Sequence, residues 1–140
     1  MITIAKEFYW DMGHRLTFHK GKCINLHGHS YKALIVIEGE EDENGMLLDY
    51  YELAKIVSPL VELLDHSFLV YEKDIELLEA LKKLNSKHVI FDKETTAENI
   101  CDFFLQNLKN KLPENVKRLQ VRIYESPKTF AEKSINLKSQ

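Results

Sequence analysis

An alternation of apolar and polar side chains over residues 2–14 is the feature that most constrains the fold of this chain. Successive side chains of a strand point to opposite faces of a sheet, so the stretch predicts one long strand with a single apolar, aromatic-rich face. That face would carry Ile2, Ile4, Phe8, Trp10, Met12 and His14. His14 is therefore expected at the end of an otherwise apolar face.

Three further stretches have the pattern of strands. A second strand, rich in Ile and Val, is expected over residues 29–38, and alternation returns over 117–125 and 128–137. The short apolar run at 89–91 is interpreted as an extended connector. Two strands thus open the chain and two close it.

Apolar residues at helical spacing predict three helices between these pairs of strands. The first spans 53–64 and is expected to kink or break at Pro59. The second spans 74–84, and the third opens with a capping box formed by Thr95 and Glu98. The order of two strands, helices and two strands favours an α+β domain, with an antiparallel sheet covered by helices on one face.

The length, net charge and cysteine content of the chain argue against several classes of protein. A length of 140 residues without repeats or linkers predicts a single domain over 1–140. A net charge of −3 argues against a general binder of nucleic acid or membrane surfaces, and no apolar run approaches a membrane span. The N-terminus lacks a signal-peptide pattern, and only Cys23 and Cys101 supply thiols, so a cytoplasmic location is expected.

The histidine pair His27 and His29 indicates a metal site. Side chains two residues apart point to the same side of an extended strand, so both imidazoles can reach one ion. His14 is interpreted as the third ligand, because pairing of the first two strands would bring it close. His19 fits the spacing equally well but lies in a polar loop. Three imidazoles leave one position open on zinc, as in catalytic sites.

Cys23 lies four residues before His27, in a polar loop that contains Lys20 and Lys22. The usual fate of a lone cysteine is that of a small buried hydrophobe. A nearby cation or metal, however, favours the thiolate, which can act as a base or a nucleophile. We therefore interpret Cys23 as a chemical group beside the metal, and Cys101, on a helix, as a packing residue.

Asp65 and His66 form an adjacent carboxylate–imidazole pair with two interpretations. The pair can end a helix, where a protonated histidine suits the helix dipole. It can instead be an acid–base dyad in which Asp65 fixes the tautomer of His66. Adjacency in sequence does not separate the two, because neighbouring side chains need not touch.

Glu125 follows the inward phase of the strand expected over 117–125. A buried carboxylate is costly unless it is paired. A ligand that donates two hydrogen bonds, such as an aminopyrimidine edge, would meet that cost. The alternative is that the strand ends at Tyr124 and that Glu125 is solvated.

Several motifs occur together in one order along the chain. They are Gly-His-Arg-Leu around His14, Cys-x3-His-Gly-His from Cys23, Gly-Met-Leu-Leu-Asp-Tyr at 45–50, Leu-Asp-His at 64–66, Thr-Ala-Glu-Asn at 96–99 and Tyr-Glu at 124–125. In this set the chain resembles the 6-pyruvoyltetrahydropterin synthase family. It is most similar to the 6-carboxytetrahydropterin synthase branch of queuosine biosynthesis, because three residues separate Cys23 from His27.

The resemblance implies a zinc-dependent site for a pterin. The zinc ligands would be His14, His27 and His29. Cys23 would be the general base, while Asp65 and His66 would move protons. Glu125 would anchor the pterin ring, with Glu98 near the same pocket.

The resemblance also implies the tunnelling fold, a four-stranded antiparallel sheet with helices packed on one face. Such subunits form trimers, and two trimers stack into a homohexamer with sites between subunits. The implied reaction converts dihydroneopterin triphosphate to 6-carboxytetrahydropterin, acetaldehyde and triphosphate. The alternatives are a 6-pyruvoyltetrahydropterin synthase or related side-chain lyase, and a non-catalytic protein that binds zinc or a pterin.

Two details of the sequence complete these expectations. Arg15, Lys20 and Lys22 are candidates for binding the triphosphate, or else solvated charges of a loop. Thr95 stands where relatives of this family frequently carry proline, and at a helix start the difference is expected to matter little.

Overall fold

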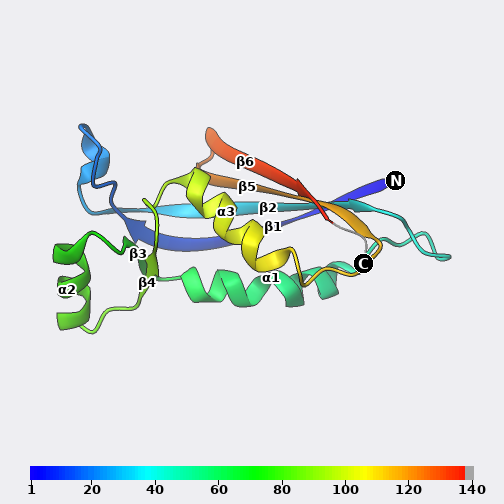
Figure 1. Cartoon of the computed structure of the whole chain (residues 1–140), viewed down its shortest axis with the longest axis horizontal. Helices are drawn as coiled ribbons and strands as arrows, with labels where there is room; N and C mark the ends of the chain where they lie inside the picture. Colours follow the sequence, from blue (N-terminus) through cyan, green and yellow to red (C-terminus); the bar gives the residue numbers. More distant parts are fainter. Residues whose placement is uncertain (138–140) are drawn as a thin grey trace.

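The computed structural model describes residues 1–137, and the last three residues of the expected domain lie outside this range. A curled six-stranded sheet carries helices on one of its faces (Figure 1). The strands are β1 (Ile2–His14), β2 (His27–Gly39), β3 (Ser67–Tyr71), β4 (His88–Phe91), β5 (Val116–Ser126) and β6 (Thr129–Asn136). The helices are α1 (Tyr50–Leu64), α2 (Ile75–Lys83) and α3 (Ala97–Leu108), with a 3-10 turn at Lys22–Ile24.

The four strands expected from alternation form the antiparallel part of the sheet, in the order β1-β2-β5-β6. The structure adds β3 and β4, which pair in parallel with each other, and β3 joins the outer edge of β1. The interpretation of 89–91 as a connector is therefore wrong. Short apolar runs lack the length that would reveal their periodicity, and their pairing is decided by tertiary contacts.

The predicted apolar face of β1 is confirmed, because Phe8, Trp10, Met12 and His14 are all buried. The first three of these residues pack with inward residues of β2 and β5 and with one stripe each of α1 and α3. The core thus lies between the sheet and these two helices, and His14 sits at its end. The position of this side chain is therefore fixed by the packing of the β1 residues before it.

The structure decides two details of the predicted helices. Helix α1 runs through Pro59, so of the expected kink or break, the break is excluded. Helix α3 is capped by Thr96, whose hydroxyl accepts the Asn99 N–H at 3.2 Å, so the predicted capping box of Thr95 and Glu98 is wrong. Thr95 is instead turned into the interior. Thr95 and Thr96 offer the same capping chemistry, and the contact of Thr95 with the interior decides which of them caps the helix.

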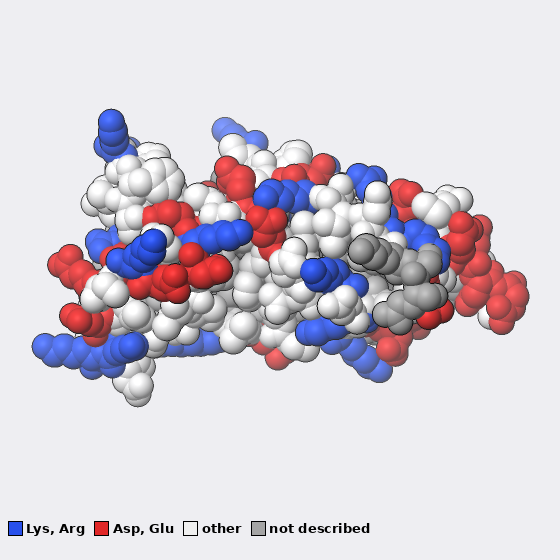
Figure 2. Space-filling view, viewed as in Figure 1, with Lys and Arg blue, Asp and Glu red and all other residues white. Residues whose placement is uncertain are grey.

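Acidic and basic side chains are interspersed over the face shown in Figure 2, and one acidic group gathers at the end where the loop after β2 lies. That face therefore offers no continuous basic surface.

Within residues 1–137, no helix has the length and apolar character that crossing a bilayer requires.

Candidate metal centre and neighbouring pocket

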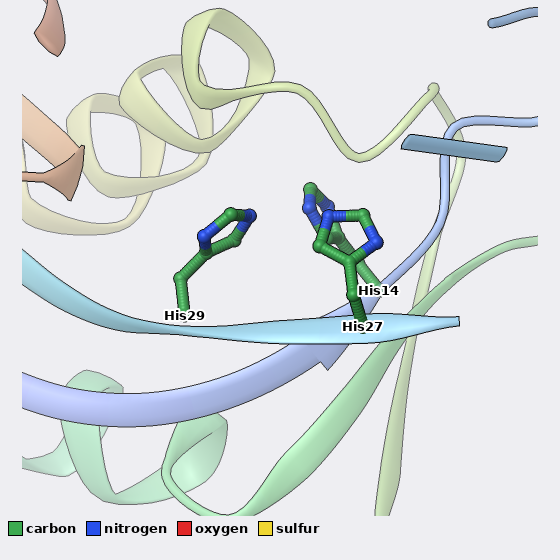
Figure 3. Close-up of side chains that lie close together, drawn as sticks. All are labelled: His14, His27 and His29. Atoms are coloured by element: carbon green, nitrogen blue, oxygen red, sulfur yellow. The ribbon is translucent and has the colours of Figure 1, made fainter. Parts of the chain in front are cut away.

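Strand register brings the three predicted histidine ligands together. In the antiparallel pairing of β1 with β2, His14 lies opposite His27, and Met12 lies opposite His29. Alternation then places all three imidazoles on the helix-covered face, where the rings converge on one space (Figure 3). The nearest ring nitrogens all lie within 4.8 Å of one another.

The geometry of the rings is that of an open tripod. Ring centroids are 4.7 Å apart for His14 and His27, 5.2 Å for His14 and His29, and 4.9 Å for His27 and His29. The planes are inclined to each other by 60° to 89°. Nitrogens bound to one tetrahedral zinc lie about 3.3 Å apart, so a small inward movement of the rings would satisfy that geometry.

Hydrogen bonds orient two of these imidazoles with one nitrogen inward. His14 Nδ1 lies 2.8 Å from the Thr95 carbonyl, and His27 Nδ1 lies 2.7 Å from the Asn25 carbonyl. A carbonyl only accepts, so each Nδ1 carries the proton and each Nε2 keeps its lone pair. The Nε2 atoms of His27 and His29 are buried without a hydrogen-bond partner. Unpartnered buried lone pairs that face one space fit a metal ion.

Burial favours the neutral form of two of these imidazoles, His14 and His29. It lowers the pKa of His14 to about 4, and the neighbouring imidazoles oppose a positive charge there as well. The pKa of His29 is also lowered, by burial and then by His27. Because a metal binds the neutral ring, the site is prepared for a cation at neutral pH.

Glu125 and Glu98 line one cavity of about 420 Å³ between α3 and β6. Strand β5 continues to Ser126, so the alternative that it ends at Tyr124 is wrong. Glu125 is half-buried, and its pKa is raised by burial and by the charge of Glu98, against a smaller opposite effect of His27. Its carboxylate therefore lies within electrostatic reach of both Glu98 and His27.

Cys23 lies in the 3-10 turn Lys22–Ile24 and is half-buried. Its carbonyl accepts the Leu16 N–H at 2.8 Å, which closes the loop between β1 and β2. Among the described residues, the histidine cluster does not include the Cys23 thiol. Within residues 1–137 the cluster is thus a three-histidine group, whereas closed structural zinc sites have four protein ligands.

Asp65 and His66 touch, as a dyad requires. His66 Nδ1 lies 2.9 Å from Asp65 Oδ1, which also accepts the Asp11 N–H at 3.0 Å. That backbone bond and His66 lower the pKa of Asp65. With Asp11 they form a second, exposed cluster that is separate from the three imidazoles.

Two contributors to these clusters were missed from the sequence. The Asp11 carboxylate accepts the Ser30 hydroxyl at 2.6 Å beside the dyad, although both residues alternate with the apolar face and looked like solvated positions. Thr95 contacts His14, although its sequence context resembled a helix cap. Only the register of distant segments could have revealed either contact.

The basic candidates of the β1–β2 loop divide into two kinds. The Arg15 guanidinium is held by two hydrogen bonds to Asp74, at 2.8 and 2.7 Å. Lys20 and Lys22 are exposed.

Cys101 is buried in the core, as expected of a packing residue, and burial raises the pKa of its thiol to about 11.

The fold and site define a class: an α+β protein with a curled, mainly antiparallel sheet, a three-histidine candidate metal centre and a neighbouring pocket lined by Glu98 and Glu125. The family model for 6-pyruvoyl tetrahydropterin synthase matches residues 3–135, and the chain belongs to that family.

Its relatives cover nearly the whole chain. It is 37% identical to a 6-carboxy-5,6,7,8-tetrahydropterin synthase of Haemophilus influenzae, over 94% of this chain and 98% of the relative. It is 32% identical to an Aquifex aeolicus protein of the same name, over 92% and 95%.

Solved structures share the fold. A catalytic-residue mutant of Plasmodium vivax 6-pyruvoyltetrahydropterin synthase superposes with a TM-score of 0.78, at 20% identity, over 97% of this chain and 98% of that one. The Caenorhabditis elegans 6-pyruvoyl tetrahydropterin synthase gives 0.68, at 23% identity, over 98% and 96%. The expected tunnelling fold is confirmed, with two short strands added to the four that were predicted.

Proposed function

We propose that the chain is a zinc-dependent 6-carboxytetrahydropterin synthase of queuosine biosynthesis. It would convert dihydroneopterin triphosphate to 6-carboxytetrahydropterin, with release of acetaldehyde and triphosphate. The observation that carries the proposal is the convergence of three imidazoles, with the Nε2 atoms of His27 and His29 buried and unpartnered, near the cavity that Glu125 lines. Relatives that carry this name, at 32% to 37% identity, support the branch.

His14, His27 and His29 would hold the metal through their Nε2 atoms. Bound zinc supplies Lewis acidity, which makes neighbouring C–H and O–H groups of a substrate easier to deprotonate. The histidines contribute position: two strands fix their spacing, and backbone carbonyls fix the tautomers of His14 and His27. The open side of the tripod is where a substrate side chain would lie.

Glu125 would bind the pterin ring. Its carboxylate offers two acceptor oxygens, and an aminopyrimidinone edge presents two N–H donors at the matching spacing. Half-burial makes the free carboxylate costly, and two charge-assisted hydrogen bonds offset that cost. Glu98 lines the same cavity and would contact the ring from helix α3.

Cys23, Asp65 and His66 would move the protons. Asp65 accepts from His66 Nδ1–H, which leaves His66 Nε2 free to take or return a proton. Cys23 would act as the base close to the metal. The dyad is exposed and stands apart from the histidine cluster of its own chain, so we propose that it completes the site of a neighbouring subunit.

Two open sheet edges support such an assembly. Strand β1 pairs with β3 only at Met12 and Gly13, so within the described part of the chain most of its outer edge has no strand partner. Strand β6 is the opposite antiparallel edge. Unpaired edges readily accept a strand from another chain. We propose that three subunits join through these edges and that two such trimers form a homohexamer, which light scattering would test.

The product decides the reaction. The zinc-loaded protein is incubated with dihydroneopterin triphosphate, and acetaldehyde and the pterin product are measured. Acetaldehyde with 6-carboxytetrahydropterin supports the proposal, whereas a pyruvoyl product assigns the chain to the alternative branch. Pterin binding without turnover would make it a non-catalytic binder. The variant His29→Ala should lose turnover, while the matched variant His88→Ala should keep it.

The remaining parts of the proposal concern partners and location. We propose a small-molecule pterin as the ligand, with no nucleic-acid or membrane partner. Both described cysteines, Cys23 and Cys101, are free thiols, which supports a reducing compartment such as the cytoplasm.

A further inference from the structure

Thr95 occupies a position that the start of a helix does not explain. It is 0% exposed, whereas Thr96 beside it supplies the N-cap of α3. A buried hydroxyl is costly unless it is hydrogen-bonded, so its partners indicate why it is there. Those partners are His14, at the end of β1, and Arg15, which follows it; they lie 81 and 80 residues earlier in the chain.

The hydrogen bonds of Thr95 fix the tautomer of His14. His14 Nδ1 lies 2.8 Å from the Thr95 carbonyl and 3.2 Å from the Thr95 hydroxyl oxygen. The hydroxyl lies 3.2 Å from the Arg15 carbonyl, which can only accept, so the hydroxyl proton is donated there. The hydroxyl oxygen therefore accepts from His14, and one Nδ1–H is shared between two acceptors of the same residue.

Arg15, the other partner, is itself fixed. Its guanidinium makes two hydrogen bonds to Asp74, whose side chain is only 5% exposed. The contact with Arg15 holds the pKa of Asp74 below its usual range. The Thr95 hydroxyl thus joins His14 to a backbone segment that is anchored on helix α2.

The other oriented histidine of the cluster has a weaker support. His27 Nδ1 bonds a single carbonyl, that of Asn25, which lies in an exposed turn. Buried hydrogen bonds meet less competition from water than exposed ones. Of these two ligands, His14 is the one that the fold positions before any ion arrives.

We propose that Thr95 is a positioning residue of the metal centre. Its hydroxyl, together with its carbonyl, holds the His14 ring with Nε2 directed at the ion. The inference rests on the proposed function only in that the three imidazoles hold a metal. Partners that orient a metal-bound histidine typically change metal affinity by 10-fold to 100-fold when they are lost.

Three variants separate positioning from general stability. Thr95→Val removes the hydroxyl at nearly constant shape, Thr95→Ser restores it, and Thr96→Val removes a neighbouring hydroxyl that caps α3 without touching His14. Zinc affinity is measured by competition with a chromophoric chelator, and the absorption spectrum of the Co²⁺-loaded protein reports ligand geometry. We expect about 10-fold weaker zinc binding for Thr95→Val, near wild-type affinity for Thr95→Ser, and unchanged affinity with a lower unfolding midpoint for Thr96→Val.

The outcomes are distinct. Wild-type zinc affinity and an unchanged Co²⁺ spectrum in Thr95→Val would overturn the positioning role while leaving the proposed function intact. Absence of zinc binding by the wild-type protein would instead remove the proposed metal site.

A further measurement needs no variant and no metal. Nitrogen-15 NMR of the metal-free wild-type protein should show His14 protonated at Nδ1, with a proton that exchanges slowly. Protonation at Nε2 would overturn the inference.

Discussion

The Nδ1 atom of His66 lies 2.9 Å from Oδ1 of Asp65, at the point where the chain leaves helix α1. His66 has a φ of +57°, and its backbone N–H donates to the Asp11 carbonyl at 2.7 Å. This reversal starts β3 alongside β1 and presents the imidazole outward. The same backbone geometry therefore positions the dyad and begins β3, one of the two strands that the sequence pattern did not reveal.

His66→Asn tests the dyad with little disturbance of the fold, because asparagine tolerates the left-handed conformation. We expect turnover to fall by about 10²-fold to 10⁴-fold, the usual contribution of a general acid–base group, with zinc affinity unchanged. Steady-state kinetics and a zinc titration check both parts. His88→Asn is the matched control and should turn over normally; a normal rate in His66→Asn would leave the pair as a helix end.

Cys23→Ala should keep zinc and the fold but lose turnover, because the thiol stands outside the histidine cluster. Zinc content and activity of the purified variant are measured together. The contrasting variant Cys101→Ala removes a buried packing group and should lower the unfolding midpoint while activity persists. Loss of zinc from Cys23→Ala would show that the thiol is a ligand, and wild-type rates would remove it from the chemistry.

Glu125→Gln should weaken pterin binding more than metal binding, because the amide replaces one of the two acceptor oxygens with an NH₂ donor and removes the negative charge. Since burial and Glu98 raise the pKa of Glu125, its affinity for a pterin should fall with decreasing pH earlier than an exposed glutamate would allow. Calorimetric titration with a stable pterin across pH checks this. Glu132→Gln, in the same cavity but paired with Arg122 at 2.7 Å, serves as the control. Unchanged affinity in Glu125→Gln would indicate a merely solvated carboxylate.

The same substitution should stabilise the ligand-free protein at neutral pH. A carboxyl whose pKa is raised on folding makes the native state less stable as pH rises through that pKa, and glutamine removes the penalty. Thermal unfolding at two pH values, with and without a pterin, measures the effect. A lower midpoint for ligand-free Glu125→Gln at pH 7 would contradict the burial argument.

Much of the candidate site follows from local pattern, because alternation fixes which side of a strand each residue faces. His14, His27 and His29 needed only the assumption that the first two strands pair. Glu125 followed from the phase of its strand in the same way.

What escaped prediction depends on contacts between distant segments. Thr95 and Thr96 are chemically equivalent candidates for the cap, and the buried His14 ring, 81 positions away in the sequence, decides between them. Strands β3 and β4 are too short to display a period, and they pair in parallel across a connection that contains helix α2. Neither outcome could be inferred from neighbouring residues.

Metal-free protein should lose stability on acidification through the buried imidazole of His14. Its pKa falls from 6.5 unfolded to about 4 folded, so the unfolded chain takes up the proton first. Stability is fully present above pH 6.5 and declines as pH falls towards 4, by on the order of 3 kcal/mol for this group. Urea unfolding at several pH values measures the slope.

His14→Gln should flatten that decline, whereas His88→Gln, on a short strand outside the cluster, should preserve it. Zinc should move the midpoint of the wild-type protein upward at pH 7, because binding to the native state alone adds about 4 kcal/mol at a thousand times the dissociation constant. The gain should shrink towards pH 5, where protons compete for the imidazoles. If the free energy of unfolding had the same pH dependence in His14→Gln and in the wild type, His14 would already be hydrated in the metal-free protein.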